Sequence, residues 1–430
     1  MSPEQPRLQA PSRLLLGAGF ATDAFDLFSM SAMLTIIATN IPISTTNKQF
    51  MTSSAVLAAA VGQILFGAAG DLFSKRTLFI TSASLMCIGS IFSAVLPLDM
   101  PNFFVWECVA RSLLGLGIGG EYPLSAALGH NLPQGGIQTS AQRLSTIFMF
   151  QGVGTVIAAL LSYVATLIVP TSLAWRACPM FGAIVSILLA IWRYRRLQYV
   201  DEICASYTID DDHPTLTQNL RTLLRGYPRQ LFGSVMNWFL LDIVFYGNGL
   251  FASQILSKLV GQDLDVTLSW NLVLALLAMI GYPVSVFLCE RLGRRNLQWG
   301  GFLLMSITYL SVGLLIDEVT RHVGYFVLLY GLTFLWTNAG PNTTTYVTAS
   351  ELFPPKIRAT ACGISAAAGK LGAFTGTMTM VKLADSASLA TVFFLCAGIS
   401  ILGVICSLIC TDDMRIKKDD RLITDDNCEV

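Results

Sequence analysis

The chain has 430 residues, of which 53% are hydrophobic and only 13% are charged, and its formal net charge is zero. Its mean hydropathy is +0.62. Soluble domains carry about a quarter charged residues, so this composition excludes an ordinary soluble protein and favours a protein of the lipid bilayer.

Apolar runs of about 20 residues predict twelve membrane-spanning helices. The first six lie at about 13–40, 50–70, 77–97, 103–128, 141–168 and 174–193. The second six lie at about 229–258, 267–288, 295–316, 321–347, 358–382 and 386–410. The polar start of the chain lacks a cleavable signal pattern, so we expect a retained cytoplasmic arm.

The basic residues of the connections predict the orientation. One side carries Lys75, Arg76, Arg143, the arginines of 193–229, Arg291, Arg294, Arg295, Lys356, Arg358 and the basic residues of the C-terminal tail. The other side carries Lys48, Arg176, Lys258, Arg321 and Lys382. The positive-inside rule therefore places both termini and the central loop in the cytoplasm. Because the basic residues follow that side, they give no support to nucleic-acid binding.

An internal repeat predicts the architecture. A single offset of 219 residues relates five pairs: Asp23 and Asp242, Asp71 and Glu290, Lys75 and Arg294, Arg76 and Arg295, and Gln151 and Lys370. Each pair falls at matching places in helices n and n + 6. We therefore expect an all-α membrane protein of two six-helix bundles, with a substrate site at the midplane between them. The expected units are 1–193, a cytoplasmic linker at 194–228, 229–410, and a cytoplasmic tail at 411–430.

Several charged residues fall inside the predicted spans, where a charge costs a few kcal/mol or more and normally faces a cavity or a partner. Asp23 and Asp26 are three residues apart and can share a helical face. Asp23 is the better functional candidate because its repeat mate is also an aspartate, whereas capping or pairing explains Asp26 equally well. Arg111 has Glu107 one turn away, which favours a structural pair over a role in proton movement.

The stretch "GIGGEYPLSA" places Glu121 on a run of glycines, where another backbone can approach closely. Pro123 frees the carbonyl of Gly119 and favours a kink. We expect a carboxylate in this apolar setting to bind and release a proton as its access to water changes. The repeat offset leads to "NAGPNTTT", in which Asn342 is the polar group.

The second half supplies further polar residues at helical spacing. In "NWFLLDIVFYG", Trp238, Asp242 and Tyr246 follow i, i+4, i+8 spacing and form a stripe about 12 Å long. Lys370 lies in "GISAAAGKLGAF", a helix of small residues that allows close packing. We expect a carboxylate across the cavity or an anionic substrate to balance its charge. A permanent pair with Asp242 is the alternative, and both can occur in different states.

Two charge motifs on the cytoplasmic side place an acid before a basic pair. They are "GAAGDLFSKRTLF", with Asp71, Lys75 and Arg76, and "LCERLGRRNLQ", with Glu290, Arg294 and Arg295. A solvated charge run is the simpler explanation. The shared offset favours paired ion pairs at a cytoplasmic gate.

These stretches, with "GFATDAFDLF", "MFQGVG" and "GPNTTTYVTASELFPPKIRATACGISAAAGKLGAF", make the sequence resemble the phosphate:H⁺ symporters of fungi and plants, in the major facilitator superfamily. The resemblance implies that Asp23 and Glu121 handle the proton, with Asp26 as a further candidate. It also implies that phosphate is surrounded by Tyr122, Gln151, Trp238, Asp242, Tyr246, Asn342 and Lys370. The family usually has "GGDYPLSA", and glutamate in its place occurs in related glycerophosphodiester transporters.

Side-chain chemistry also favours phosphate. Lys370 supplies positive charge, while ionised Asp242 can only accept hydrogen bonds. Monoanionic phosphate still has hydroxyl protons to donate, whereas sulfate has none at neutral pH and would face an unpaired carboxylate. Anion entry against a negative potential is uphill by about 2.3 kcal/mol per charge per 100 mV, so coupling to protons is expected.

The predicted function is therefore a proton-coupled importer of inorganic phosphate that works by alternating access in the plasma membrane. Its expected partners are phosphate, protons and the lipid bilayer, with no cofactor, no metal and no defined oligomeric state. A carrier of glycerophosphodiesters or other organophosphates is the nearest alternative, and a phosphate-sensing receptor is more distant. The chain has no nucleophile–base pair, metal-ligand spacing or phosphate-binding loop motif, so an enzyme is not expected.

Overall fold

The computed structural model describes residues 13–129, 139–197, 215–261 and 263–412, and in these ranges it is helical without any strand. The predicted N-terminal arm, the middle of the linker and nearly all of the predicted tail lie outside the described residues. So do His130 and His213.

The first half of the chain supplies six spans. They are α1 (Arg13–Ala38), α2 (Thr45–Gly70), α3 (Lys75–Val95), α4 (Phe103–Ile118) with α5 (Glu121–Gly129), α6 (Ser140–Ile168) and α8 (Ala177–Arg196). A single turn, α7 (Thr171–Ala174), connects the last two. The capping box of Thr139 and Gln142 fixes the start of α6 by satisfying backbone N–H groups that have no partner within the helix.

The second half supplies six more spans. They are α11 (Pro228–Gly249) with α12 (Ala252–Val260), α13 (Leu264–Leu292), α14 (Arg294–Leu314), α16 (Val323–Ala339) with α17 (Pro341–Glu351), α18 (Arg358–Ser386) and α19 (Leu389–Cys410). Shorter elements are α10 (Leu216–Gly226) before the first of these spans, α15 (Ile316–Val319), and the 3₁₀ turn η1 (Pro355–Ile357).

The twelve predicted spans are confirmed, although three of them are broken. Among the described residues, nine helices are long and apolar enough to cross a bilayer, and α11 with α12, bent by 40°, makes a tenth. The pair α16–α17 and helix α18 complete the set, although they are less apolar.

Two of the helix breaks lie at equivalent positions of the internal sequence repeat. The fourth span breaks between α4 and α5, immediately before Glu121, and the tenth breaks between α16 and α17, at Gly340. These two residues are 219 apart, which is the offset of the internal repeat. At Gly119 and Gly340 an added Cβ atom would collide with the backbone of a neighbouring helix, so both breaks lie at close helix contacts. Pro341 in the first turn of α17 has no N–H to leave unpaired. The kink predicted near Pro123 therefore exists, but it lies at the preceding glycines.

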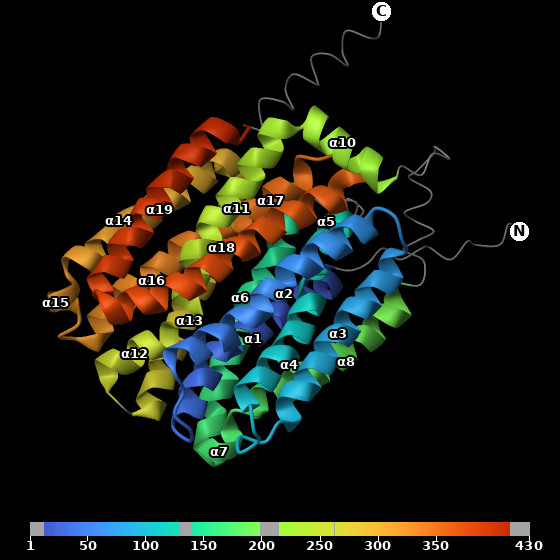
Figure 1. Cartoon of the computed structure of the whole chain (residues 1–430). Coiled ribbons are helices and arrows are strands. Elements are labelled where there is room, and N and C mark those ends of the chain that lie inside the picture. Colours follow the sequence, from blue (N-terminus) through green and yellow to red (C-terminus); the bar gives the residue numbers. More distant parts are fainter. Residues whose placement is uncertain (1–12, 130–138, 198–214, 262, 413–430) are drawn as a thin grey trace, which may run out of the picture.

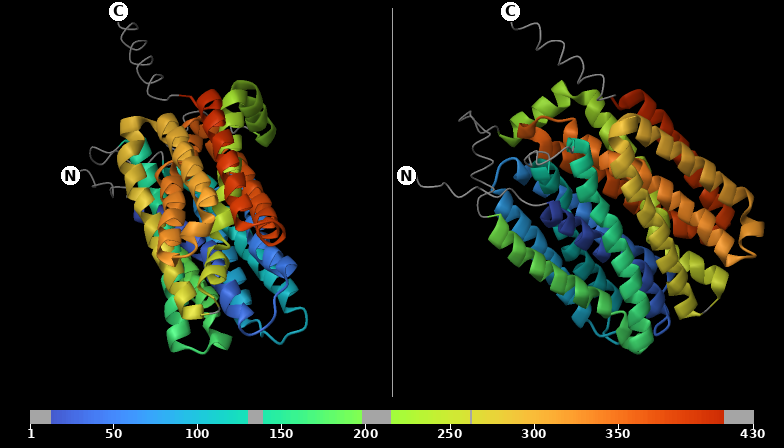
Figure 2. Two further views of the ribbon diagram at one scale, coloured as in Figure 1. Left: turned by 90° about the vertical axis from the view of Figure 1, so that its left-hand side faces the viewer. Right: turned by 180° about the vertical axis from the view of Figure 1, so that it is seen from behind.

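The helices form two bundles that lie against each other (Figure 1). Helices α1 to α8 pack together in one bundle, and α11 to α19 pack together in the other (Figures 1 and 2). The bundles meet chiefly where α2 packs on α18 and where α6 packs on α13. We call the end of the molecule at which α10 lies the α10 end, and the opposite end, with α7, α12 and α15, the α12 end (Figure 1).

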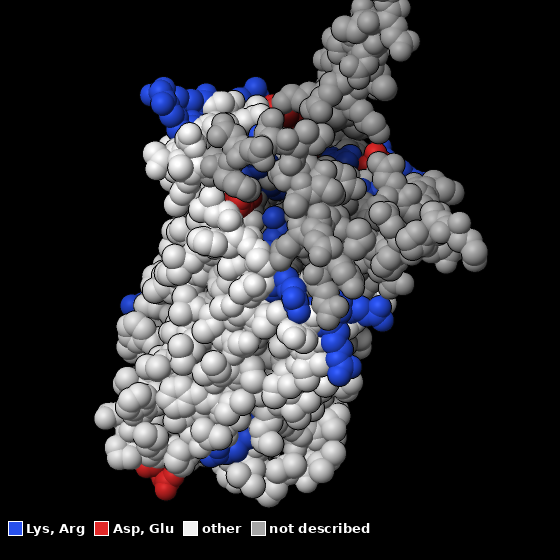
Figure 3. Space-filling view, turned by 90° about the vertical axis from the view of Figure 1, so that its right-hand side faces the viewer, with Lys and Arg blue, Asp and Glu red and all other residues white. Residues whose placement is uncertain are grey.

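The flank of the molecule is apolar. In the space-filling view, Lys and Arg side chains gather toward the α10 end, and a largely uncharged band lies below them (Figure 3). Large hydrophobic side chains are also exposed on the spanning helices, for example Leu65 and Leu188. An uncharged belt between charged ends is the surface expected of a protein that spans a bilayer.

Glycines allow the two bundles to approach closely where α2 crosses α18. A Cβ atom added to Gly67 would lie 3.0 Å from the Cα atom of Gly363. A Cβ atom added to Gly363 would collide with the backbone carbonyl of Gln63. The contact therefore joins one backbone directly to the other, as in other small-residue helix crossings.

Gly363→Ala should destabilise the folded protein by about 1–3 kcal/mol because the added methyl group meets backbone atoms that cannot move aside. Its melting temperature in detergent should fall below that of the unsubstituted protein. Gly398→Ala is the matched control because a Cβ atom there meets nothing within 4 Å. Equal melting temperatures for the two variants would contradict the close approach of α2 and α18.

Candidate functional site

A buried cluster around Lys370 lies between α11 and α18. Its Nζ atom donates to the hydroxyl of Tyr246 at 2.8 Å and to Oδ2 of Asp242 at 3.3 Å. All three side chains are about 1% exposed. The i, i+4 spacing predicted from the sequence does place Asp242 and Tyr246 on one face, and the structure shows the Lys370–Asp242 pair that the sequence left as an alternative.

The first bundle contributes Tyr122 to the same cluster. Lys370 Nζ lies 5.2 Å from the centre of the Tyr122 ring and 4.1 Å from that of Tyr246, so both rings face the cation. The rings of Tyr122 and Trp238 lie 5.8 Å apart. The structure therefore brings together four predicted substrate residues and their lysine from both bundles.

The other two predicted substrate residues form a second group around Asn342. Its Nδ2 atom lies 2.8 Å from Oδ1 of Asn338, 3.3 Å from the hydroxyl of Tyr282 and 3.4 Å from Oε1 of Gln151. Gln151 belongs to α6 and Asn342 to α17, so this contact also joins the bundles. Tyr282 and Asn338 were not recognised from the sequence. The repeat offset of 219 residues relates Tyr282 to Gln63, a polar residue that is also buried. This relation is a sequence signal that could have identified Tyr282.

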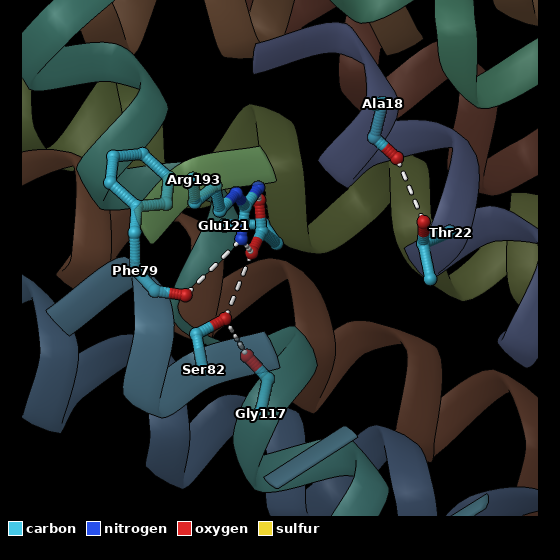
Figure 4. A network of polar contacts seen from close by, with 7 residues as sticks. All are labelled: Ala18, Thr22, Phe79, Ser82, Gly117, Glu121 and Arg193. Carbon is cyan, nitrogen blue, oxygen red and sulfur yellow. Dashed lines mark hydrogen bonds and ion pairs between the residues drawn. The ribbon is translucent and has the colours of Figure 1, made fainter. Parts of the chain in front are cut away.

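Glu121 forms a fully buried ion pair with Arg193 of α8 (Figure 4). The two arginine nitrogens approach the two carboxylate oxygens at 2.6 and 2.5 Å, and Oε1 also accepts from Ser82 at 2.8 Å. Arg193 donates as well to the carbonyl of Phe79 at 3.3 Å and lies 4.6 Å from its ring. This network ties together α3, α5 and α8 (Figure 4).

Arg193 was predicted to lie with the arginines of the central loop, and this prediction is wrong. The residue lies within α8, and none of its side chain is exposed. The adjacent Arg195 and Arg196, which are exposed, made the whole run resemble a cytoplasmic flank. Glycine opposite the ion pair makes room for it, because a Cβ atom on Gly19 of α1 would collide with both Glu121 and Arg193.

Asp23 is buried near this network without joining it. Its side chain is 1% exposed, and neither carboxylate oxygen has a hydrogen-bond partner among the described residues. Its carboxylate interacts electrostatically with Glu121, Arg193, Asp26 and Lys370. Asp23 is therefore a buried acid that interacts electrostatically with members of both ion pairs, Glu121–Arg193 and Lys370–Asp242. Among the described residues, no cation is hydrogen-bonded to its carboxylate.

Asp26 belongs to a different neighbourhood. Arg111 donates to its backbone carbonyl at 2.7 Å, and its carboxylate lies against Gly182 of α8. Glu107, predicted as the partner of Arg111, instead accepts from Ser93 at 2.8 Å, although it still interacts electrostatically with the arginine. The two aspartates of α1 therefore lie in different surroundings.

The acid of the first gate motif contacts the other bundle, and Lys75 also interacts with it electrostatically. The carboxylate of Asp71 accepts from the backbone N–H groups of Ala359 and Thr360 at 3.1 and 2.8 Å. These groups belong to the first turn of α18, where a negative charge is stabilised. Burial raises the pKa of Asp71 to about 6, and hydrogen bonds from Thr360 and Ala359 act in the opposite direction. Asp71 therefore joins the bundles at the α10 end through a helix N-terminus.

The second gate motif does form ion pairs. Arg294 contacts Glu290 at 3.0 Å and Glu351 at 2.9 Å, and Glu290 also accepts from Thr139 of the other bundle at 3.0 Å. Glu351, in "ASELFPPK", was not recognised from the sequence. The remaining gate residues pair elsewhere: Arg76 donates to the carbonyl of Tyr194 at 3.2 Å, and Arg295 donates to that of Leu408. Lys75 lies in the first turn of α3.

The described residues contain no group of three His, Cys, Asp or Glu side chains that could hold a metal ion. The described cysteines are all unpaired thiols. The site contains the buried cations Lys370 and Arg193, the buried acids Asp23, Glu121 and Asp242, neutral hydrogen-bond donors and aromatic rings. Such a set can bind an anion and move a proton.

Comparison with known proteins defines the class. Residues 18–414 match the family described as "Sugar (and other) transporter", so the chain belongs to this family of major facilitator transporters. These are carriers rather than enzymes, in agreement with the sequence analysis.

Several relatives have more specific names. The chain is 30% identical to the "Probable inorganic phosphate transporter 1-10" of Oryza sativa subsp. japonica, over 94% of this chain and 87% of that protein. It is 28% identical to the "Low affinity inorganic phosphate transporter 4" of Lotus japonicus, over 93% of this chain and 88% of that protein.

Solved structures support the fold. The proton:xylose symporter XylE, solved with 6-bromo-6-deoxy-D-glucose, superposes with a TM-score of 0.75 at 17% identity, over 91% of this chain and 94% of that one. A partially occluded inward-open form of XylE from E. coli gives a TM-score of 0.72 at 15% identity, over 91% and 97% of the two chains.

Neutralising one member of the Glu121–Arg193 pair should cost more than neutralising both. Arg193→Gln or Glu121→Gln alone leaves a buried charge without its partner, which costs about 3–5 kcal/mol. We expect each single variant to lower the melting temperature in detergent by about 5–10 °C and the double variant to lower it less. Additive losses would show that the two side chains do not interact.

Asp71→Ala should open the α10 end because it removes both hydrogen bonds to the start of α18. Cys362, four residues into α18, is fully buried and reports the opening. We expect faster labelling of Cys362 by a polar thiol reagent, measured by mass spectrometry of the purified protein. Asp99→Ala is the control because Asp99 is exposed in the connection between α3 and α4. Unchanged labelling in both variants would contradict a closing role for Asp71.

Proposed function

We propose that this chain is a proton-coupled importer of inorganic phosphate that works by alternating access. The observation that carries the proposal is the buried cluster of Lys370, Tyr246, Asp242 and Tyr122 at the meeting of the two bundles. The names of the plant relatives, all inorganic phosphate transporters, support the same substrate.

The cluster suits a phosphate monoanion. Lys370 supplies a positive charge in a setting that excludes water, where an ion pair is stronger than in solution. The hydroxyl of Tyr246 and the indole N–H of Trp238 are neutral donors, and Asp242 accepts the hydroxyl proton that phosphate retains. In the structure Lys370 and Asp242 are paired at 3.3 Å. A bound phosphate would separate Lys370 from Asp242 and form a new contact with each of them.

The proton is assigned to Asp23, with Glu121 beside it. Asp23 supports this role best because its buried carboxylate has no hydrogen-bond partner among the described side chains. Such a group is neutral when access to water is lost and charged when access returns. Glu121 differs because Arg193 already balances its charge. In this proposal Glu121 exchanges a proton only when Arg193 moves away from it.

Contacts at both ends support an occluded state in an alternating cycle. At the α10 end Asp71 contacts α18 and Thr139 contacts Glu290. At the α12 end Gln49 donates to the carbonyl of Met378 at 2.8 Å, and Ser31 bonds to Ser253 at 3.2 Å. The positive-inside rule supports assigning the α10 end to the cytoplasm. We further propose the plasma membrane as the location.

Uptake of labelled phosphate into proteoliposomes under an inward proton gradient tests the proposal. We expect gradient-driven uptake of phosphate by the unsubstituted protein and no uptake of labelled sulfate under the same gradient. Lys370→Gln should reduce it by at least about 100-fold because the positive charge at the site is lost. Lys382→Gln, which changes an exposed lysine of the same helix, should leave uptake unchanged.

Adding excess glycerophosphoinositol distinguishes the nearest alternative. Phosphate uptake that persists in its presence supports an inorganic phosphate carrier. Weak phosphate uptake that the competitor abolishes would overturn the proposed substrate in favour of an organophosphate. Phosphate uptake that ignores the proton gradient would overturn the proposed coupling.

A further inference from the structure

A cavity opens between the two bundles at the α12 end, away from Lys370. Its cavity volume is about 330 Å³, and its wall is formed by α1, α2, α11, α12, α13, α18 and α19. We call it the outer vestibule and identify it by Thr35, Lys48, Asn248, Gln254, Lys258 and Thr267.

Two lysines, one from each bundle, line the outer vestibule. Among the described residues that line it, Lys48 and Lys258 are the charged side chains, and no lining residue is acidic. Lys48 comes from α2 in one bundle and Lys258 from α12 in the other. Most other lining residues are apolar or small, and walls of low dielectric constant concentrate the field of such charges.

Two buried polar atoms in the same wall have no hydrogen-bond partner among the described residues. They are Oδ1 of Asn248 and Nε2 of Gln254. Asn248 is fully buried on α11, and its amide nitrogen already donates to the carbonyl of Val244 at 2.8 Å. A small hydrated oxyanion offers a donor to Asn248 through its water molecules and an acceptor to Gln254 through its oxygens. The wall therefore lacks the kind of groups that such an anion supplies.

The outer vestibule ends next to the central cluster. Gly247 and Asn248 line it, and the preceding residue of α11 is Tyr246, which bonds to Lys370. The ring of Phe28 stacks on that of Tyr246 at 5.5 Å, and Phe245 lies edge-on to both. None of these three rings lines the vestibule, and Phe28 and Phe245 line a separate cavity. An anion in the vestibule would therefore reach Lys370 by passing along α11 from Asn248 to Tyr246.

We propose that the outer vestibule is a capture site for small oxyanions, in which Lys48 and Lys258 concentrate the anion before it passes to Lys370. This inference rests on the proposed function and on the outward orientation of the α12 end. Because two lysines bind an anion through its charge alone, the capture site does not distinguish phosphate from sulfate. Asp242, deeper in the protein, makes that distinction.

Uptake kinetics of labelled phosphate in cells that produce the full chain provide the first test. For Lys48→Gln with Lys258→Gln, we expect KM at low salt to rise about tenfold with little change in the maximal rate, and the difference to shrink at high salt, where charges are screened. Lys382→Gln is the matched control because this exposed lysine lies on α18 near the vestibule without lining it. An unchanged KM in the double variant would overturn the proposal.

Covalent labelling separates this proposal from the proposed function because it does not require transport. Pyridoxal phosphate carries a phosphate group and an aldehyde, so borohydride reduction fixes it to lysines near a bound anion. We expect Lys48 and Lys258 of the purified protein to be labelled faster than Lys382, with protection by both phosphate and sulfate. Equal labelling of the three lysines, or no protection, overturns the capture site even if phosphate uptake succeeds. If phosphate uptake fails while protected labelling persists, only the proposed substrate is wrong.

Discussion

A charge buried in the bilayer needs a counter-charge, and this requirement organises the interior of the molecule. Lys370 has Asp242, and Glu121 has Arg193, each pair being almost completely shielded from solvent. The two pairs differ in what surrounds them. Glu121–Arg193 is locked by Ser82 and Phe79 within one bundle, whereas Lys370 is surrounded by hydroxyl and aromatic groups that a ligand can replace. In the proposed function, Lys370–Asp242 is therefore the substrate pair, whereas Glu121–Arg193 holds its bundle together until Arg193 moves away.

Much of the fold could be predicted from the sequence because its signals are periodic. Apolar runs predicted twelve helices, and the offset of 219 residues predicted two related halves. The same offset relates the breaks before α5 and at Gly340, so the repeat extends to interruptions of the helices. Their positions were harder to predict, because Pro123 marks a kink only approximately while the glycines before it carry the actual break.

The candidate site was only partly predictable. Asp242 and Tyr246 were found because helical spacing places them on one face, and Lys370 because a charge stands out in an apolar run. Arg193 and Glu351 were missed because their partners lie 72 and 57 residues away, and no local pattern joins residues at such separations. Arg193 also ends an apolar run next to two exposed arginines, where a basic residue normally marks the membrane boundary.

Helix α18 has a consequence for how the protein is made. It carries Lys370 and the glycines at its crossings with α2 and α11, and it is not among the described helices apolar enough to be recognised as spans. A segment of this kind gains little free energy by entering lipid alone. Its insertion during synthesis must therefore draw on contacts with α11 and α2, which are already present when it emerges. The features that build the anion site thus make the assembly of the second bundle cooperative.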